Sequence, residues 1–181
     1  MNSENKYNSS AGLLVESLAG EFFRGVKLIN EIEDEVYQQK ANGSGSIGGH
    51  FRHNLDFLNS FLNGLEIRKI DYQNRERDER IEINRNYAIE RIMFTTQRIV
   101  NLKESDLARE ILVRSEIDEN VWHKSSVARE IEFLHSHTIH HHALIAEKLT
   151  SFGVKVSSVF GVAPSTLKFW AEQEFTAKQA V

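Results

Sequence analysis

Most of the coordination chemistry available to this chain lies in one histidine cluster, within the segment 133–145 that reads FLHSHTIHHHALI. Imidazole nitrogens bind divalent transition metals, and neutral imidazole is the commonest metal-binding side chain in proteins. The cluster is internal, so it is not a terminal expression tag. A histidine on an apolar face is also often a hydrogen-bonded core residue. The direction in which each ring faces therefore decides between metal binding and packing.

Helical geometry separates these histidines into two sets. Successive residues turn by about 100° around an α-helix, so residues four apart differ by about 40°. With Glu130 as the reference, His137 lies near −20° and His141 near +20°, roughly, on the side of the apolar stripe. We expect these two rings, one turn apart, to hold one ion together. The other three are predicted to point away from the core: His135 and His142 toward solvent, and His140 on the flank.

A further ligand is available in the segment GHFRHNLD, which spans residues 49–56 and carries His50 and His53. Metal sites in helical bundles are commonly built from side chains on facing helices, so either ring can complete the site. The helical wheel favours His50, which lies nearer the apolar stripe of its segment. Glu130 has two interpretations: it orients an imidazole from outside the coordination shell, or it is a first-turn acid near the positive helix end.

The elements that must position these side chains are helical. Apolar residues at three- and four-residue steps predict four helices. Their ranges are 12–40, from a cap at Ser44 or Ser46 to about 68, 78–102, and from a cap at Ser125 or Ser126 to about 152. Between 107 and 124 the pattern alternates, which predicts a small extended excursion. Pro164 falls in the first turn of a predicted short C-terminal helix.

These elements predict an all-α fold, an antiparallel four-helix bundle that forms a single domain over residues 1–181 with a flexible N-terminus at 1–10. The chain has no cysteine, so disulfides and thiolate ligands are excluded and a metal must be held by nitrogen and oxygen. A net charge of −4 and the lack of a basic stripe disfavour a nucleic-acid partner. With no apparent secretory signal and no apolar stretch long enough to span a bilayer, we expect a cytoplasmic protein.

The chain resembles the DinB-like (YfiT-like) superfamily of four-helix-bundle metalloproteins with a three-histidine site. The resemblance rests on two motifs: Ser46-Ile47 before His53 with Asp56 three residues after it, and the pair His137-x-x-x-His141 with His140 between. It implies a bundle of the DinB-like type with His53, His137 and His141 as metal ligands and His50 as a neighbour or alternate ligand. Asp56 is then a contact on the helix surface or beyond the coordination shell. His142-Ala143-Leu144 replaces the Arg-Gly-Gln that follows the last ligand in many relatives.

The resemblance also implies a function. Characterised members include transferases and isomerases that use low-molecular-weight thiols, so we expect a metal-dependent enzyme that acts on a thiol, with one zinc or nickel ion. Metal-dependent hydrolysis and a non-catalytic, stress-associated bundle that binds a partner are the alternatives. Candidates for substrate contacts or proton transfer are Tyr72, Arg75 and Glu130. A homodimer is expected because relatives pair through bundle faces; no membrane or nucleic-acid partner is expected.

Overall fold

The computed structural model describes residues 10–40 and 45–179, and within them the chain is mostly helical with one small sheet. This confirms the predicted helical class. The predicted flexible N-terminus, up to residue 9, and the predicted cap at Ser44 lie outside the described residues. The helices are α1 (Ser10–Glu31), α2 (Asp34–Gln38), α3 (Ile47–Ile67), α4 (Arg80–Ile83), α5 (Arg85–Val100), α6 (Glu104–Leu107), α7 (Val127–Ser151) and α8 (Pro164–Gln179). The strands are β1 (Lys69–Ile70), β2 (Glu110–Arg114) and β3 (Trp122–Ser126).

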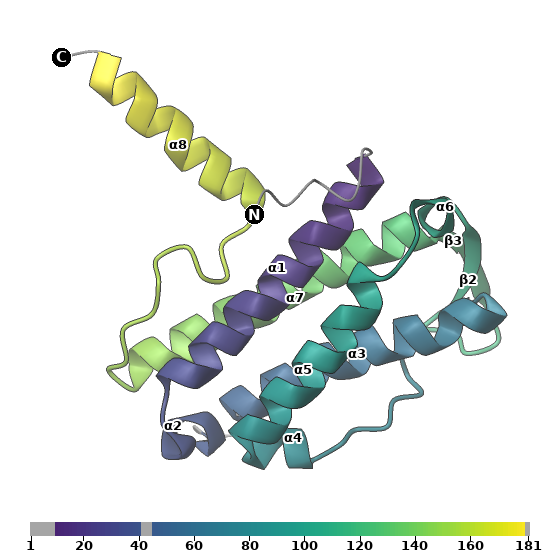
Figure 1. The fold of residues 1–181 in the computed structure, drawn as a ribbon, viewed down its shortest axis with the longest axis horizontal. Helices are drawn as coiled ribbons and strands as arrows, with labels where there is room; N and C mark the ends of the chain where they lie inside the picture. The colour runs from purple at the N-terminus through teal and green to yellow at the C-terminus, as the bar shows by residue number, and fades with distance from the viewer. Residues whose placement is uncertain (1–9, 41–44, 180–181) are drawn as a thin grey trace.

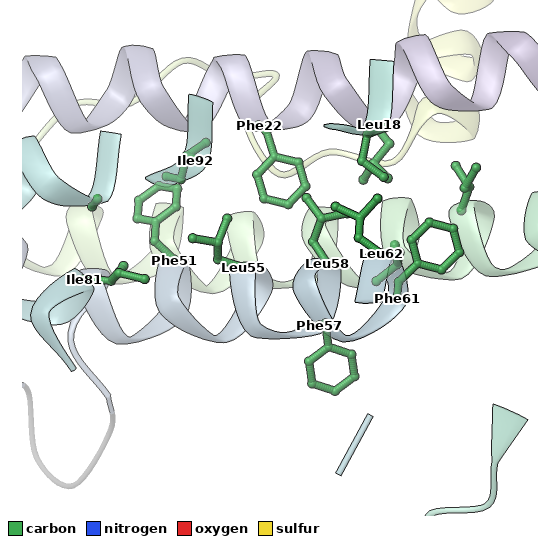
Figure 2. Packing of buried hydrophobic residues seen from close by; sticks show 14 of the residues in the cluster. Leu18, Phe22, Phe51, Leu55, Phe57, Leu58, Phe61, Leu62, Ile81 and Ile92 are labelled. Atoms are coloured by element: carbon green, nitrogen blue, oxygen red, sulfur yellow. The ribbon is translucent and has the colours of Figure 1, made fainter. Parts of the chain in front are cut away.

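Four long helices enclose the core. Helix α1 packs against α5 and α7, and α3 packs against the same two helices (Figure 1). Figure 2 shows Leu18 and Phe22 of α1 pointing toward Phe51 and Leu58 of α3. Phe57, by contrast, extends from the opposite side of α3, although it too is buried. Helix α3 therefore has two buried sides, and the second side carries the candidate site.

Two predicted helices are each interrupted. The first ends at Glu31 and the chain resumes as α2, while the third is divided at Asn84 into α4 and α5. The side chain of Asn84 accepts a hydrogen bond from the backbone N–H of Tyr87 and so caps α5. The buried Tyr37 of α2 donates its hydroxyl to the carbonyl of Ile81 at 2.6 Å. The two short helices therefore pack together at one end of the core.

The predicted extended excursion is an antiparallel hairpin. Strands β2 and β3 pair with Ile111 opposite Ser125 and Val113 opposite His123. The two-residue strand β1 adds to β2 in parallel and was not predicted, because two residues carry no periodicity. Since β1 follows α3 directly and β3 runs directly into α7, the sheet joins the ends of the two helices that carry the histidines.

The C-terminal helix begins at Pro164, as predicted, but its 16 residues make it longer than expected. Figure 1 shows it extending away from the rest of the molecule. Its aromatic residues Phe169, Trp170 and Phe175 are exposed. Among the described residues, no helix is both long and apolar enough to cross a membrane.

Two helical glycines test the packing of α3. At Gly48 a Cβ would lie 2.3 Å from the carbonyl oxygen of Glu82, whereas at Gly20 in α1 it would meet no described atom within 4 Å. Gly48→Ala should therefore lower the free energy of unfolding by about 1–3 kcal/mol. Gly20→Ala should raise it by about 0.5–1 kcal/mol, because alanine favours helix. Urea denaturation followed by circular dichroism measures both; an equal loss in the two variants would contradict this account of α3.

Candidate metal centre

Three histidines from two helices converge at one point. His53 of α3 and His137 and His141 of α7 each offer a ring nitrogen, and these three atoms lie within 4.8 Å of one another. The ring centroids are 5.1 Å apart for His53 and His137, 4.6 Å for His53 and His141, and 4.7 Å for His137 and His141. The structure thus brings together the pair that the wheel selected and the third ring that the family resemblance selected.

The arrangement of these rings fits a small divalent ion. Three nitrogens at about 2.05 Å from a tetrahedral zinc ion would lie about 3.3 Å from one another, so modest rotations of the rings close the observed triangle. The Nε2 atom of His137 is buried and has no hydrogen-bond partner in the described part of the chain. Neutral imidazoles are ligands for zinc, nickel, copper and iron alike. The cluster could therefore bind a metal ion.

Helix caps fix the register that aligns these rings. The hydroxyl of Ser46 accepts from the backbone N–H of Gly49 at 3.0 Å and begins α3. Ser126 accepts from the N–H of Arg129 at 3.2 Å and begins α7. Each cap stabilises its helix by about 1 kcal/mol. The 137/141 spacing then places both rings of α7 on the side that faces α3.

An aromatic wall covers one side of the cluster. The ring of Phe57 stacks on His137, with centroids 4.3 Å apart and planes at 26°, and also on Tyr72 at 5.1 Å. Phe133 packs against His137 and Tyr72. Sequence reasoning missed this wall, because Phe57 and Phe133 look like ordinary core residues. Their proximity to histidines in each helix was the signal available.

Burial keeps the three imidazoles neutral. Desolvation is the largest cause that lowers their pKa values, to about 4 for His53 and His137 and to about 3 for His141. Repulsion between neighbouring imidazolium charges lowers them further. The positive charge of Arg75 also lowers the pKa values of His53 and His137. At neutral pH these rings therefore offer lone pairs and no charge.

His50 lies next to this cluster and outside the three-histidine group. Its Nδ1 atom is 2.9 Å from Nδ1 of His141, so one ring donates and the other accepts. If His141 donates from Nδ1, its Nε2 keeps a free lone pair; if it accepts, Nε2 carries the proton. Coordination through Nε2 of His141 would therefore require His50 as the acceptor, which gives His50 an orienting role.

The prediction that His142 faces solvent is wrong. Its side chain is 1% exposed, stacks on Phe160 with centroids 4.4 Å apart, and lies 3.2 Å from Glu21 through Nδ1. Burial lowers the pKa of His142, so the neutral ring donates Nδ1–H to the carboxylate. The wheel assumed one buried face, whereas α7 packs against both α1 and α3. The wheel also placed His135 and His140 away from the core. His135 is half-buried and His140 is exposed.

The two predicted carboxylates bind groups other than the clustered histidines. Glu130 is a first-turn acid of α7, and its buried oxygens accept hydrogen bonds from the hydroxyls of Tyr72 at 2.9 Å and Ser125 at 2.6 Å. These hydrogen bonds favour the interpretation of Glu130 as a first-turn acid, because its partners are hydroxyls and not an imidazole. Asp56 is buried and forms an ion pair with Arg52 at 2.8 Å. Of the two predicted roles for Asp56, its burial contradicts a contact on the helix surface, while a contact beyond the coordination shell stays a prediction.

A pocket gives access to the cluster. Its volume is about 510 Å³, it is open toward solvent, and the first two turns of α3 form much of its wall. His53 and His141 line it, so a small molecule inside can approach two of the three rings. Its other charged or imidazole-bearing residues are Lys40, His50, Arg52 and Glu82.

Comparison with known proteins yields little. No protein-family model matches the chain. FK506-binding protein 5 of Rhizopus delemar is 32% identical over 108 residues, which are 58% of this chain and 28% of that protein. The chain thus matches little more than a quarter of the length of that relative.

The low pKa values predict metal binding that resists acid. Because proton competition begins only near pH 4, the affinity for zinc should change less than twofold between pH 7 and 5.5. Three rings with an ordinary pKa of 6.5 would lose roughly 500-fold over the same interval. Competition with a chelator of known affinity at each pH measures the difference. A loss of several hundredfold would show that the rings are solvated.

His50→Ala separates an orienting ring from a ligand. Loss of an orienting hydrogen bond should weaken zinc binding by about 10- to 100-fold while one ion per chain still binds at saturation. Isothermal titration gives both the affinity and the stoichiometry. His140→Ala, an exposed neighbour on α7, is the matched control and should change the affinity less than twofold. Loss of the ion altogether in His50→Ala would make His50 a ligand.

Proposed function

We propose that this chain is a metal-dependent enzyme whose ion is held by His53, His137 and His141. The observation that carries the proposal is the convergence of three neutral imidazole nitrogens within 4.8 Å, beside an open pocket. We further infer a four-helix bundle of the DinB-like type as the scaffold. The pairwise packing of α1, α3, α5 and α7 and the placement of the histidines on α3 and α7 support that inference.

Three protein ligands favour catalysis over a structural role. Structural zinc sites usually have four protein ligands, while catalytic sites leave a position for substrate or water. A divalent ion in this site would supply Lewis acidity and would lower the pKa of a coordinated thiol or water. The pocket beside His53 and His141 is where such a molecule would enter. Phe57 and Phe133 pack against His137, the ring of the three that does not line this pocket.

Among the candidate reactions, thiol transfer fits these residues better than hydrolysis. A hydrolase benefits from a carboxylate that accepts a proton from water. Glu82, the carboxylate that lines the pocket, is bound by the guanidinium of Arg52, and Asp56 is bound by the same side chain. A thiol needs no such base once its pKa is lowered. We therefore propose a transferase that acts on a low-molecular-weight thiol, with zinc or nickel as the ion and a homodimer as the assembly.

Elemental analysis of the purified chain tests the metal proposal. The wild-type chain and His140→Ala should each carry about one zinc or nickel ion after metal loading and desalting. His137→Ala should carry less than a tenth of that amount, because only two ligands remain. Circular dichroism should show the same helix content in all three. Equal metal content in His137→Ala and the wild-type chain would refute the site.

Cobalt substitution tests the thiol proposal. Addition of 2-mercaptoethanol to the cobalt-loaded chain should produce a sulfur-to-cobalt charge-transfer band that saturates, and 2-propanol should produce none. A screen of thiols with an electrophilic acceptor then measures transfer. Ester hydrolysis without any thiol would instead favour the hydrolase, and a metal-loaded chain that admits neither thiol nor water would favour a non-catalytic bundle.

A further inference from the structure

The loop between β1 and α4, residues 71–79, is fixed at both ends. Asp71 accepts from Arg114 of β2 at 2.8 Å, and Asp78 accepts from the hydroxyl of Tyr87 of α5 at 2.7 Å. Arg77 adopts a left-handed backbone conformation with φ of 55°, which is uncommon for a residue other than glycine. These constraints hold the loop in one path across α3. Arg75 lies in the middle of that path.

Arg75 points inward and has no carboxylate partner. Its Cζ atom lies 4.7 Å from the ring centroid of Phe57, the same ring that stacks on His137. Its Nε atom is buried and makes no hydrogen bond to any described residue. Within the described part of the chain, no carboxylate oxygen lies within 4.0 Å of the guanidinium nitrogens of Arg75, the limit for an ion pair. Burial lowers the pKa of this guanidinium, which nonetheless stays charged at neutral pH.

Arg75 lines a pocket whose wall also carries four carboxylates, and three of these already form ion pairs with arginines. This pocket of about 570 Å³ is lined by Arg75 and Arg91 together with Asp56, Asp71 and Asp78. Each of the three aspartates forms an ion pair with an arginine that does not line the pocket: Arg52, Arg114 and Arg80, respectively. The other acid, Glu76, is exposed. Asp56 and Glu116 attract the charge of Arg75 from a distance, but neither carboxylate forms an ion pair with it. The guanidinium is therefore free to bind an anion directly.

The remaining wall offers polar donors and a flat ring. Asn59 and Asn63 line the pocket, and their amide oxygens accept hydrogen bonds from Thr95 at 3.3 Å and Arg98 at 3.1 Å. This orientation directs the amide oxygens to the protein and leaves the NH₂ groups as the ends that can donate. Trp122 also lines the pocket.

We propose that Arg75 binds the oxyanionic group, a carboxylate or a phosphate, of a small molecule in this pocket. Guanidinium groups recognise both anions through paired N–H donors. The amides of Asn59 and Asn63 would contact the polar remainder of the ligand. The pocket is distinct from the metal centre, since none of the three clustered histidines lines it; the ring of Phe57 contacts both Arg75 and His137. The proposal therefore does not require that a metal binds.

Tryptophan fluorescence tests this proposal directly. The chain has two tryptophans, so Trp170→Phe leaves Trp122 as the only reporter. The full chain is titrated with methyl phosphate, with propionate, and with the uncharged isostere propionamide, both with EDTA and with zinc. At least one anion should bind with saturation, at least tenfold more tightly than propionamide, and in EDTA as well as in zinc. The anion that binds more tightly identifies the source of the oxyanion.

Variants then assign the binding to Arg75. Arg75→Gln should weaken the anion at least tenfold, and Arg75→Lys should weaken it less, because lysine keeps the charge and loses the paired donors. The control is Lys155→Gln, which removes an exposed positive charge that does not line this pocket and should leave the affinity unchanged. No saturation with either anion, or equal affinity in Arg75→Gln, overturns the proposal.

A second measurement covers a variant that does not fold. In the wild-type chain, anion titration should shift the Nε–H resonance of Arg75 in a nitrogen-proton correlation spectrum. The shift should saturate with the dissociation constant obtained from Trp122 fluorescence. An unchanged resonance overturns the proposal. Anion binding in a chain that takes up neither zinc nor nickel would refute the proposed function and leave this site standing. Metal uptake without anion binding would refute the anion site and leave the proposed function standing.

Discussion

The contact between α3 and α7 is the constraint on which the rest of the structure depends. It brings three imidazoles to one point, buries them enough to keep them neutral, and leaves the Nε2 atom of His137 without a hydrogen-bond partner among the described residues. An unsatisfied buried polar atom costs about 1–3 kcal/mol, and several neutral rings packed together resist protonation. Coordination of an ion would satisfy the Nε2 atom of His137, so under the proposed function metal binding would stabilise the packing of α3 against α7.

The sequence was sufficient to predict the helices and the clustered histidines, for a common reason. Long amphipathic segments and the four-residue spacing of His137 and His141 are local patterns, and tertiary contacts then preserve them. The choice of His53 over His50 was not local: the wheel favoured His50, and only the family motif indicated the ring that the structure places in the cluster. The difference between these two rings is set by where α7 crosses α3, which no property of either helix alone determines.

The failures share another physical cause, which is burial on more than one side. A helical wheel with one apolar face places His142 in solvent, yet α1 covers that face and Glu21 accepts its N–H. Phe57, which lies off the predicted apolar stripe of its helix, is likewise buried and forms the wall of the cluster from the second buried side of α3. The breaks at residues 32–33 and 84 and the strand β1 depend on contacts between short segments, and such contacts leave no periodic signal.

Two groups of polar side chains along α7 differ: those that contact a carboxylate or carry one, and the clustered imidazoles, which do neither in the part of the chain that the structure describes. Glu130 binds two hydroxyls and Glu21 binds His142, so each buried acid near the helix is occupied. The three clustered imidazoles, in contrast, are uncharged and form no ion pair within the described residues. A divalent ion held by them would keep its full charge of two, because its protein ligands supply none to offset it. Under the proposed function, that uncompensated charge favours an anionic donor such as a thiolate, and the open pocket beside His53 and His141 is where it would bind.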